Sequence, residues 1–152
     1  MSQINFEHVI PQHQFNISLI VLKYFCTIRQ NIIIMLYTNL KHLESIAEHN
    51  KAISENENVM VICGRMGPMC IPVYGIAEQL ETEYKQVKFF DMEFDNPISE
   101  IIRNLPEVRG FMGIPFTIYY KNGKVVKATS SIQTKDQVKA ILNKEYSAVV
   151  TA

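Results

Sequence analysis

The chain has 152 residues, of which 47% are hydrophobic and 20% charged, values typical of one globular domain with a substantial core. Lysine and arginine number 15, as do aspartate and glutamate, so the formal net charge is zero and the basic excess of nucleic-acid-binding proteins is missing. Three cysteines are too few for the disulfide framework of a small secreted protein, and they indicate a reducing, cytoplasmic environment.

Residues 1–34 differ in character from the rest of the chain. Their apolar stretches, Phe15 to Cys26 and Ile32 to Ile34, are shorter than the roughly 20 apolar residues that cross a bilayer. The start carries Glu7 and no basic region, so a secretory signal and a membrane partner are not expected. Two interpretations stay open for this extension: it packs on a domain formed by residues 35–152, or it is not part of the functional protein, because Met35 directly precedes a clean domain start.

The first half of residues 35–152 predicts two helices around one strand. A helix capped by Thr38 would end near Asn50, because apolar residues recur between them at helical spacing. The polar residues 54–58 predict a loop. The continuous apolar run Val59–Cys63 then predicts a central strand covered on both faces. A second helix is expected after residue 70, with the apolar residues of its buried face spaced over 73–84.

The middle of the chain predicts a second strand and a third helix. Residues 87–94 alternate in part between polar and apolar side chains, as a strand does. Asp95 and Asn96 then lead into a helix with Pro97 at its first position, a place that suits proline because no hydrogen bond is lost there. Pro106 would stop this helix.

The C-terminal part predicts a hairpin and a last helix. Phe116–Tyr120 and Val125–Ala128 flank Asn122-Gly123, a strong two-residue hairpin turn. Thr134 and Gln137 have the spacing of a capping box. Because helices alternate with strands before the hairpin, we expect an α/β fold: a mixed sheet of about four strands with helices on both faces.

Several segments resemble thioredoxin. Gly113-Ile114-Pro115-Phe116-Thr117 and Tyr120-Lys121-Asn122-Gly123-Lys124 are similar to its cis-proline segment and the hairpin that follows, and Asp95-Asn96-Pro97 resembles its Asp-x-Asn-Pro step, one residue shorter. With the Gly67-Pro68 turn between strand and helix, the resemblance covers residues 36–146. It implies a thioredoxin fold, a cis Ile114–Pro115 bond facing the turn, and a role in cell redox homeostasis.

The turn itself departs from the family. Thioredoxins carry Trp-Cys-Gly-Pro-Cys, whereas this chain reads Arg65-Met66-Gly67-Pro68-Met69-Cys70. Aligning the Gly-Pro pairs replaces both cysteines by methionine. Aligning Cys70 with the second cysteine puts Gly67 in the first position, and helix phase favours this register. In both registers Met60 or Val61 replaces the buried acid of the family.

Cys70 is the candidate reactive thiol. It lies where a helix begins, and both the helix terminus and the nearby Arg65 would favour its thiolate. A single thiol forms mixed disulfides but needs a second thiol to complete a dithiol reduction. Cys63, seven residues earlier, is the candidate resolving thiol, with a plain buried strand residue as the other interpretation.

The methionines near the turn predict a hydrophobic docking groove. Methionine adapts to varied apolar partners, and Met66, Met69 and Met112 would rim one groove in a thioredoxin fold. No histidine forms a ligand pattern with the cysteines, so neither a metal nor a cofactor is expected. The predicted substrate-binding residues are Arg65, Met66, Gly67, Pro68, Met69, Met112, Gly113, Ile114 and Pro115.

Two functions remain open. The first is an atypical thiol–disulfide oxidoreductase that acts on a protein disulfide or thiol, with Cys70 as reactive thiol, Cys63 as possible resolving thiol, and an unidentified thiol reductant as second partner. The second is a non-catalytic thioredoxin-fold module that binds a protein through the methionine-lined groove. Fold similarity alone does not decide between them.

Overall fold

A mixed sheet of five strands in the order β1-β3-β2-β4-β5 forms the centre of residues 36–146, the part of the chain that the computed structural model describes. The predictions for residues 1–34 lie outside this part. The elements are β1 Lys41–His42, α2 Ile46–Glu55, β2 Asn58–Gly64, α3 Ile71–Glu83, β3 Lys88–Glu93, a 3-10 turn Pro97–Ser99, α4 Glu100–Arg103, a 3-10 turn Pro106–Val108, β4 Phe116–Lys121, β5 Lys124–Ser130 and α5 Lys135–Tyr146.

The sheet combines both strand directions, as the sequence predicts. β3 pairs in parallel with β1 and β2, because helical crossovers connect these strands. β4 pairs antiparallel with β2 and with β5. The sheet has one strand more than the four expected. The additional strand is β1, which has only two residues and lies at the edge of the sheet beside β3.

The first helix begins later than predicted. Ser45, not Thr38, caps α2, and its Oγ accepts a hydrogen bond of 3.1 Å from the backbone N–H of Glu48. The Thr38 hydroxyl instead donates to the buried carboxylate of Asp91 on β3. This long-range contact holds the segment before β1 against β3. The helix therefore starts at Ile46, later than predicted, and ends at Glu55 rather than near Asn50.

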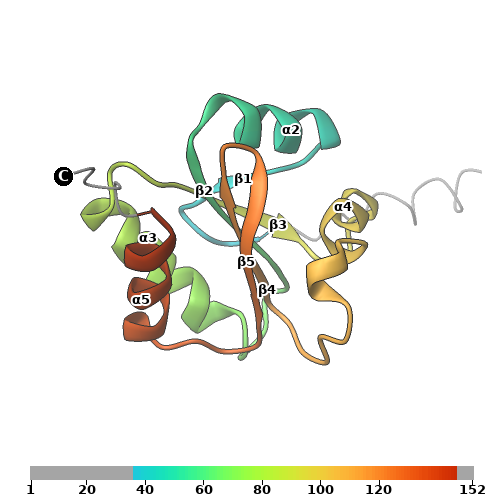
Figure 1. Ribbon diagram of the computed structural model, residues 1–152. Coiled ribbons are helices and arrows are strands. Elements are labelled where there is room, and N and C mark those ends of the chain that lie inside the picture. The colour runs from blue at the N-terminus through green and yellow to red at the C-terminus, as the bar shows by residue number, and fades with distance from the viewer. Residues whose placement is uncertain (1–35, 147–152) are drawn as a thin grey trace, which may run out of the picture. The chain divides into compact units, whose positions relative to one another are not determined.

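Two apolar layers enclose the sheet, and Figure 1 shows α3 and α5 on one side of the strands and α4 on the other. All seven residues of β2 are buried, and alternate side chains point to opposite faces. Met60 and Ile62 face the layer formed with α3 and α5. Val59, Val61 and Cys63 face the layer that includes residues of α2 and α4. Both faces of the sheet are therefore covered by helices, as expected for an α/β fold.

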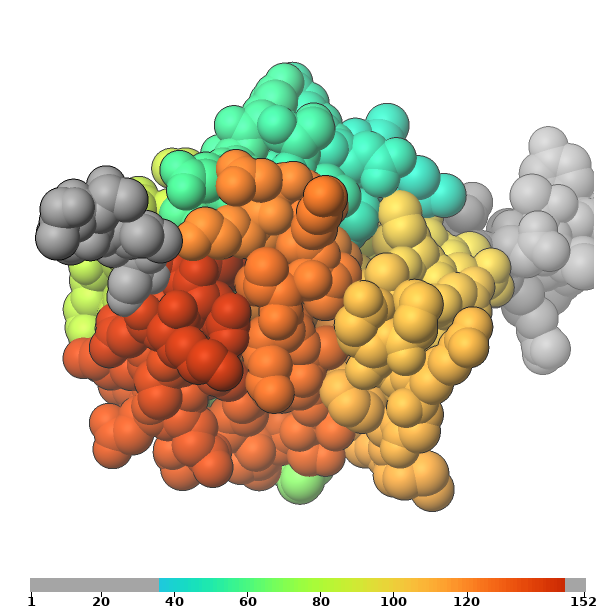
Figure 2. All heavy atoms as spheres, in the orientation of Figure 1, coloured from blue at the N-terminus to red at the C-terminus, as the bar shows by residue number. Residues whose placement is uncertain are grey.

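The C-terminal elements form as their local sequence predicts. Asn122 and Gly123 both have positive φ, 51° and 75°, which the two-residue hairpin turn requires. In the capping box, the Thr134 N–H donates to Gln137 Oε1 at 2.9 Å and the Gln137 N–H to Thr134 Oγ1 at 3.3 Å. Figure 2 shows the hairpin strands on this face between α5 and the segment around α4. No helix within residues 36–146 has the length and apolar character needed to cross a membrane.

Candidate active site

Cys70 lies at the N-terminal end of α3, the position that the favoured register assigns to it. The Gly67 carbonyl accepts hydrogen bonds from the N–H groups of Cys70 at 2.9 Å and of Ile71 at 3.0 Å. This tight turn connects β2 to the helix, and Pro72 occupies the first turn of α3. Cys70 is the N-cap residue of a 13-residue helix, but its side chain makes no capping hydrogen bond.

The Cys70 sulfur and Pro115 lie together around Gly64. A Cβ atom built on Gly64 would be 3.0 Å from Cys70 Sγ, 3.0 Å from Pro115 Cβ and 2.7 Å from the Tyr74 hydroxyl. The 2.7 Å separation is shorter than Cβ atoms show in real structures and the two of 3.0 Å are tight, so a side chain at this position would force one or more of these groups to move. The Ile114–Pro115 peptide bond is cis. The structure thus brings together a thiol from α3 and the proline that precedes β4.

The Cys70 thiol is buried, with 1% of the residue exposed. The backbone N–H of Arg65 donates to Cys70 Sγ at 3.4 Å, and this hydrogen bond and the Arg65 charge both favour the thiolate. Burial has the larger effect and raises the pKa of the Cys70 thiol above its ordinary value. The burial of the sulfur therefore opposes the thiolate stabilisation that the sequence predicts for this position.

Cys63 belongs to the opposite layer of the core. It is fully buried among the residues that pack beneath α4, whereas Cys70 packs with α3 and α5. Burial raises the pKa of Cys63 to about 12. Both thiols are free. β2 directs the Cys63 side chain toward the layer opposite the one in which Cys70 packs, so the two thiols belong to different layers of the core.

Arg65 fixes the exposed side of the turn. Its side chain donates two hydrogen bonds of 2.6 Å to the Asp95 carboxylate. Its guanidinium also lies 5.2 Å from the centroid of the Phe94 ring. Arg65 therefore contacts the candidate thiol through its backbone, while its side chain holds the turn to the loop that follows β3.

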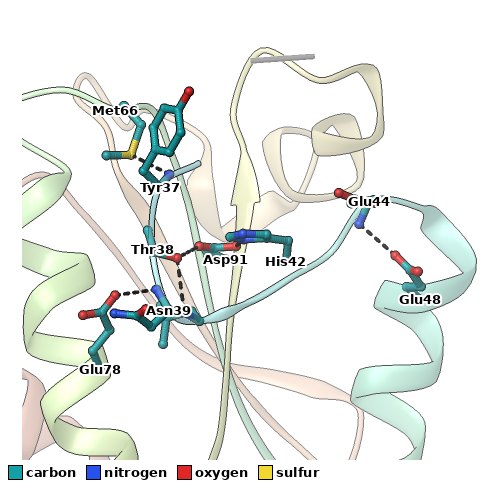
Figure 3. A network of polar contacts seen from close by, with 10 residues as sticks. Tyr37, Thr38, Asn39, His42, Glu44, Glu48, Met66, Glu78 and Asp91 are labelled. Carbon is teal, nitrogen blue, oxygen red and sulfur yellow. Dashed lines mark hydrogen bonds and ion pairs between the residues drawn. The ribbon is translucent and has the colours of Figure 1, made fainter. Parts of the chain in front are cut away.

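The three methionines of the predicted groove differ in exposure. Met66 is half-buried, and its Sδ accepts the Tyr37 N–H at 3.4 Å (Figure 3). Met69 is 47% exposed, and Met112 is 98% exposed. Met66 therefore anchors the turn to the segment before β1, while Met69 and Met112 present apolar surface to solvent.

The remaining predicted binding residues differ in their surroundings. Gly67 is half-buried and Pro68 is exposed on the outer side of the turn. Gly113 is close to Ser131, whose Oγ would lie 2.6 Å from a Cβ on that glycine. Ile114 packs against both core layers.

Sequence reasoning missed two buried residues with polar side chains, Tyr74 and Asp91. Tyr74 is buried on α3, four residues after Cys70, and this spacing on one helix face could have indicated it. Asp91 is a carboxylate inside an otherwise apolar strand; it accepts from Thr38 and contacts His42 Nδ1 at 2.5 Å (Figure 3). Burial raises the pKa of Asp91, and these two contacts oppose that shift.

A comparison with known proteins finds its matches among solved structures. A structure of Plasmodium falciparum thioredoxin is 25% identical, with a TM-score of 0.59, and the match covers 70% of this chain and 99% of that one. Thioredoxin from Trypanosoma brucei brucei is 18% identical, with a TM-score of 0.60 and coverage of 74% and 96%. Thioredoxin f2 from Chlamydomonas reinhardtii is 16% identical, with a TM-score of 0.58 and coverage of 70% and 95%.

No protein-family model and no curated protein matches the chain. The structural matches nevertheless span almost the whole of each thioredoxin. The chain has a thioredoxin-like fold.

Proposed function

We propose that the chain is a thioredoxin-like protein that carries out thiol–disulfide exchange through Cys70 alone, on a protein disulfide presented beside Pro115. The observation that carries this proposal is the convergence of Cys70 Sγ and Pro115 around Gly64. A thiol next to a proline-containing loop offers a sulfur nucleophile and a backbone segment against which an extended peptide can lie.

The reaction balances with one protein thiol and one external reductant. Cys70 loses its proton to solvent and attacks one sulfur of the substrate disulfide, forming a mixed disulfide while the other substrate sulfur leaves as a thiolate and takes up a proton. A low-molecular-weight thiol then attacks the mixed disulfide at the Cys70 sulfur, releasing the second substrate thiol. A second molecule of that thiol regenerates Cys70. The substrate gains two electrons, and the small thiol is oxidised to its disulfide.

The geometry supports a single-thiol reaction over a dithiol one. In the register favoured by helix phase, Gly67 takes the position of the first thioredoxin cysteine, and Cys63 belongs to the other core layer. The raised pKa of Cys70 makes its thiolate scarce at neutral pH, so exchange should be slow there and accelerate as the pH rises. We also propose a cytoplasmic location, which fits the absence of a disulfide between the two described cysteines.

Incubation with glutathione disulfide tests the proposal, with the adduct located by peptide mass spectrometry. Cys70 should acquire glutathione in the wild-type chain and in Cys63→Ser, and Cys70→Ser should lose that adduct. The adduct on Cys70 should disappear on addition of reduced glutathione. Failure of native Cys70 to form an adduct at pH 8.5, under conditions where the urea-unfolded chain forms one, would overturn the proposal.

A second candidate function, a non-catalytic peptide-binding module, is favoured by a different observation. The Cys70 sulfur is buried, whereas the side chains of Met69, which precedes it in the turn, and of Met112, which precedes the cis-proline segment, are exposed. Reduced and carboxymethylated insulin B chain, which cannot exchange disulfides, is a suitable probe. This function predicts binding that survives Cys70→Ser and is weakened in the double variant Met69→Ser, Met112→Ser; unchanged binding in the double variant would contradict it.

A further inference from the structure

The Tyr74 hydroxyl is a buried polar group beside the Cys70 sulfur. Tyr74 is 2% exposed and lies one helical turn after Cys70, with its N–H donating to the Cys70 carbonyl at 3.1 Å. Both side chains therefore leave α3 on the same face. Both also reach the same point: a Cβ on Gly64 would be 2.7 Å from the Tyr74 hydroxyl and 3.0 Å from Cys70 Sγ.

This hydroxyl has no hydrogen-bond partner within residues 36–146. Buried hydroxyl groups are normally paired, because removing them from water without a partner is costly. In contrast, the Tyr146 hydroxyl, which is also buried, donates to the Val59 carbonyl at 2.7 Å. The Thr117 hydroxyl on β4 is also buried without a partner, so what distinguishes Tyr74 is that its unpaired donor and the Cys70 thiol reach the same point.

We propose that the Tyr74 hydroxyl donates a hydrogen bond to the Cys70 thiolate when that thiolate forms. This inference rests on the proposed function and adds to it the group that stabilises the nucleophile. Hydrogen bonds from hydroxyl groups to ions are stronger than those to neutral groups. The interaction would therefore favour the charged state of Cys70 over the thiol and increase the population of the species that attacks a disulfide.

Tyr74 can act here only as a donor. Its burial, followed by the negative charges of the Cys70 thiolate and of Asp91, raises the pKa of the phenol well above its ordinary value. The phenol therefore keeps its proton throughout the pH range in which a thiol ionises. Tyr74 stabilises the thiolate without taking up the proton that Cys70 releases.

The other charged groups around the thiol come from neighbouring elements. Arg65 in the turn favours the thiolate, while Glu93 at the end of β3 disfavours it. The negative charges of Asp91 on β3, of the Cys63 thiolate on β2 and of Glu93 all raise the pKa of the Tyr74 phenol. These groups remain in a Tyr74→Phe variant, so a change in that variant reports the loss of one hydroxyl.

The test compares Tyr74→Phe with Tyr84→Phe in the full-length Cys26→Ser, Cys63→Ser background, where Cys70 is the remaining thiol. Tyr84 directly follows the last residue of α3 and donates to Asn143 at an exposed site, so it controls for the loss of any tyrosine hydroxyl. The readouts are the thiolate absorbance near 240 nm against pH and the rate of alkylation by iodoacetamide. A rise of one unit in the pKa of Cys70 is a tenfold loss of thiolate at a fixed pH below the pKa.

We expect Tyr74→Phe to raise the pKa of Cys70 and to slow alkylation at pH 8 by roughly tenfold, with Tyr84→Phe matching the background protein. Urea unfolding verifies that both variants fold. If Tyr74→Phe does not fold, 3,5-difluorotyrosine at position 74 keeps the shape with a more acidic hydroxyl and should lower the pKa of Cys70. An unchanged titration of Cys70 in a folded Tyr74 variant would overturn the inference.

This outcome separates the inference from the proposed function. If Cys70 forms the glutathione adduct but its titration does not respond to Tyr74, the inference fails and single-thiol exchange stands. If native Cys70 forms no adduct although its titration responds to Tyr74, the hydrogen bond exists and the proposed function fails.

Discussion

Arg65 and Asp95 are joined by two parallel hydrogen bonds of 2.6 Å, which tie the turn before Cys70 to the loop after β3. The pair is half-exposed, so its contribution to folding is small, at most about 1 kcal/mol. The pair has a larger effect on the ionisation of the Cys70 thiol than on folding, because it holds the Arg65 side chain in place. The guanidinium lies over the Phe94 ring, and its positive charge favours the Cys70 thiolate.

Replacing Arg65 should therefore change reactivity more than stability. We expect Arg65→Met to raise the pKa of Cys70 and slow its alkylation, because the favourable charge is lost while the backbone N–H to Sγ remains. Arg103→Met is the control, since Arg103 lies at a similar distance over the same ring, 5.4 Å. Thiolate absorbance against pH measures the effect; equal titrations of Cys70 in the two variants would contradict the assigned role of the charge.

A side chain at Gly64 should disturb the point where three groups converge. Gly64→Ala places a Cβ atom 2.7 Å from the Tyr74 hydroxyl and 3.0 Å from Cys70 Sγ, so these atoms must move. Overpacking of this kind typically costs about 1–3 kcal/mol. Gly67→Ala is the matched control, because a Cβ there meets no atom within 4 Å. Urea unfolding gives both free energies, and similar losses at the two positions would disprove the tight packing at Gly64.

Acid should weaken the fold through His49. This side chain is buried, with Nε2 at 3.2 Å from the Tyr120 hydroxyl, and burial lowers its pKa below 6.5. Since the unfolded chain then binds more protons than the folded one, the free energy of unfolding should fall as the pH drops from 6.5 toward the lowered value. His49→Gln should flatten this fall between pH 6.5 and 5. Urea titrations at several pH values measure it, and a slope unchanged by the substitution would rule out His49 as its source.

The Tyr146 hydroxyl should contribute measurably to stability. It donates to the Val59 carbonyl at 2.7 Å and so joins α5 to the central strand in a buried position. Tyr146→Phe removes this bond and should cost about 1–2 kcal/mol. Tyr84→Phe, which removes an exposed hydrogen bond to Asn143, should cost clearly less. Thermal or urea unfolding compares them, and the reverse order would contradict the assignment.

Local chemistry made much of the fold predictable. The apolar run of β2, the Asn122-Gly123 turn and the Thr134–Gln137 capping box each depend on residues within a few positions of one another. The start of α2 could not be predicted in this way. Thr38 and Ser45 have the same capping chemistry, and what separates them is Asp91, 53 residues after Thr38, which takes the threonine hydroxyl as a partner.

The candidate site was predictable in position but not in electrostatics. The spacing of the turn and the helix phase located Cys70 at the start of α3, where the structure has it. The balance between helix terminus and burial depends on how Gly64, Tyr74 and Pro115 pack around the sulfur, and these contacts join three separate segments. The layer that Cys63 faces likewise follows from strand parity in the assembled sheet.

The placement of two free thiols in different layers of one core gives the protein a pair of internal reporters. Cys63 is a buried residue of the central strand β2, so it should react with a thiol reagent only when the sheet unfolds. Cys70 lies at the start of α3, so it should become accessible when the first turn of that helix unfolds locally. Thiol labelling at low denaturant would thus distinguish local opening from whole-domain opening at two native residues of a single sample, without an introduced reporter residue.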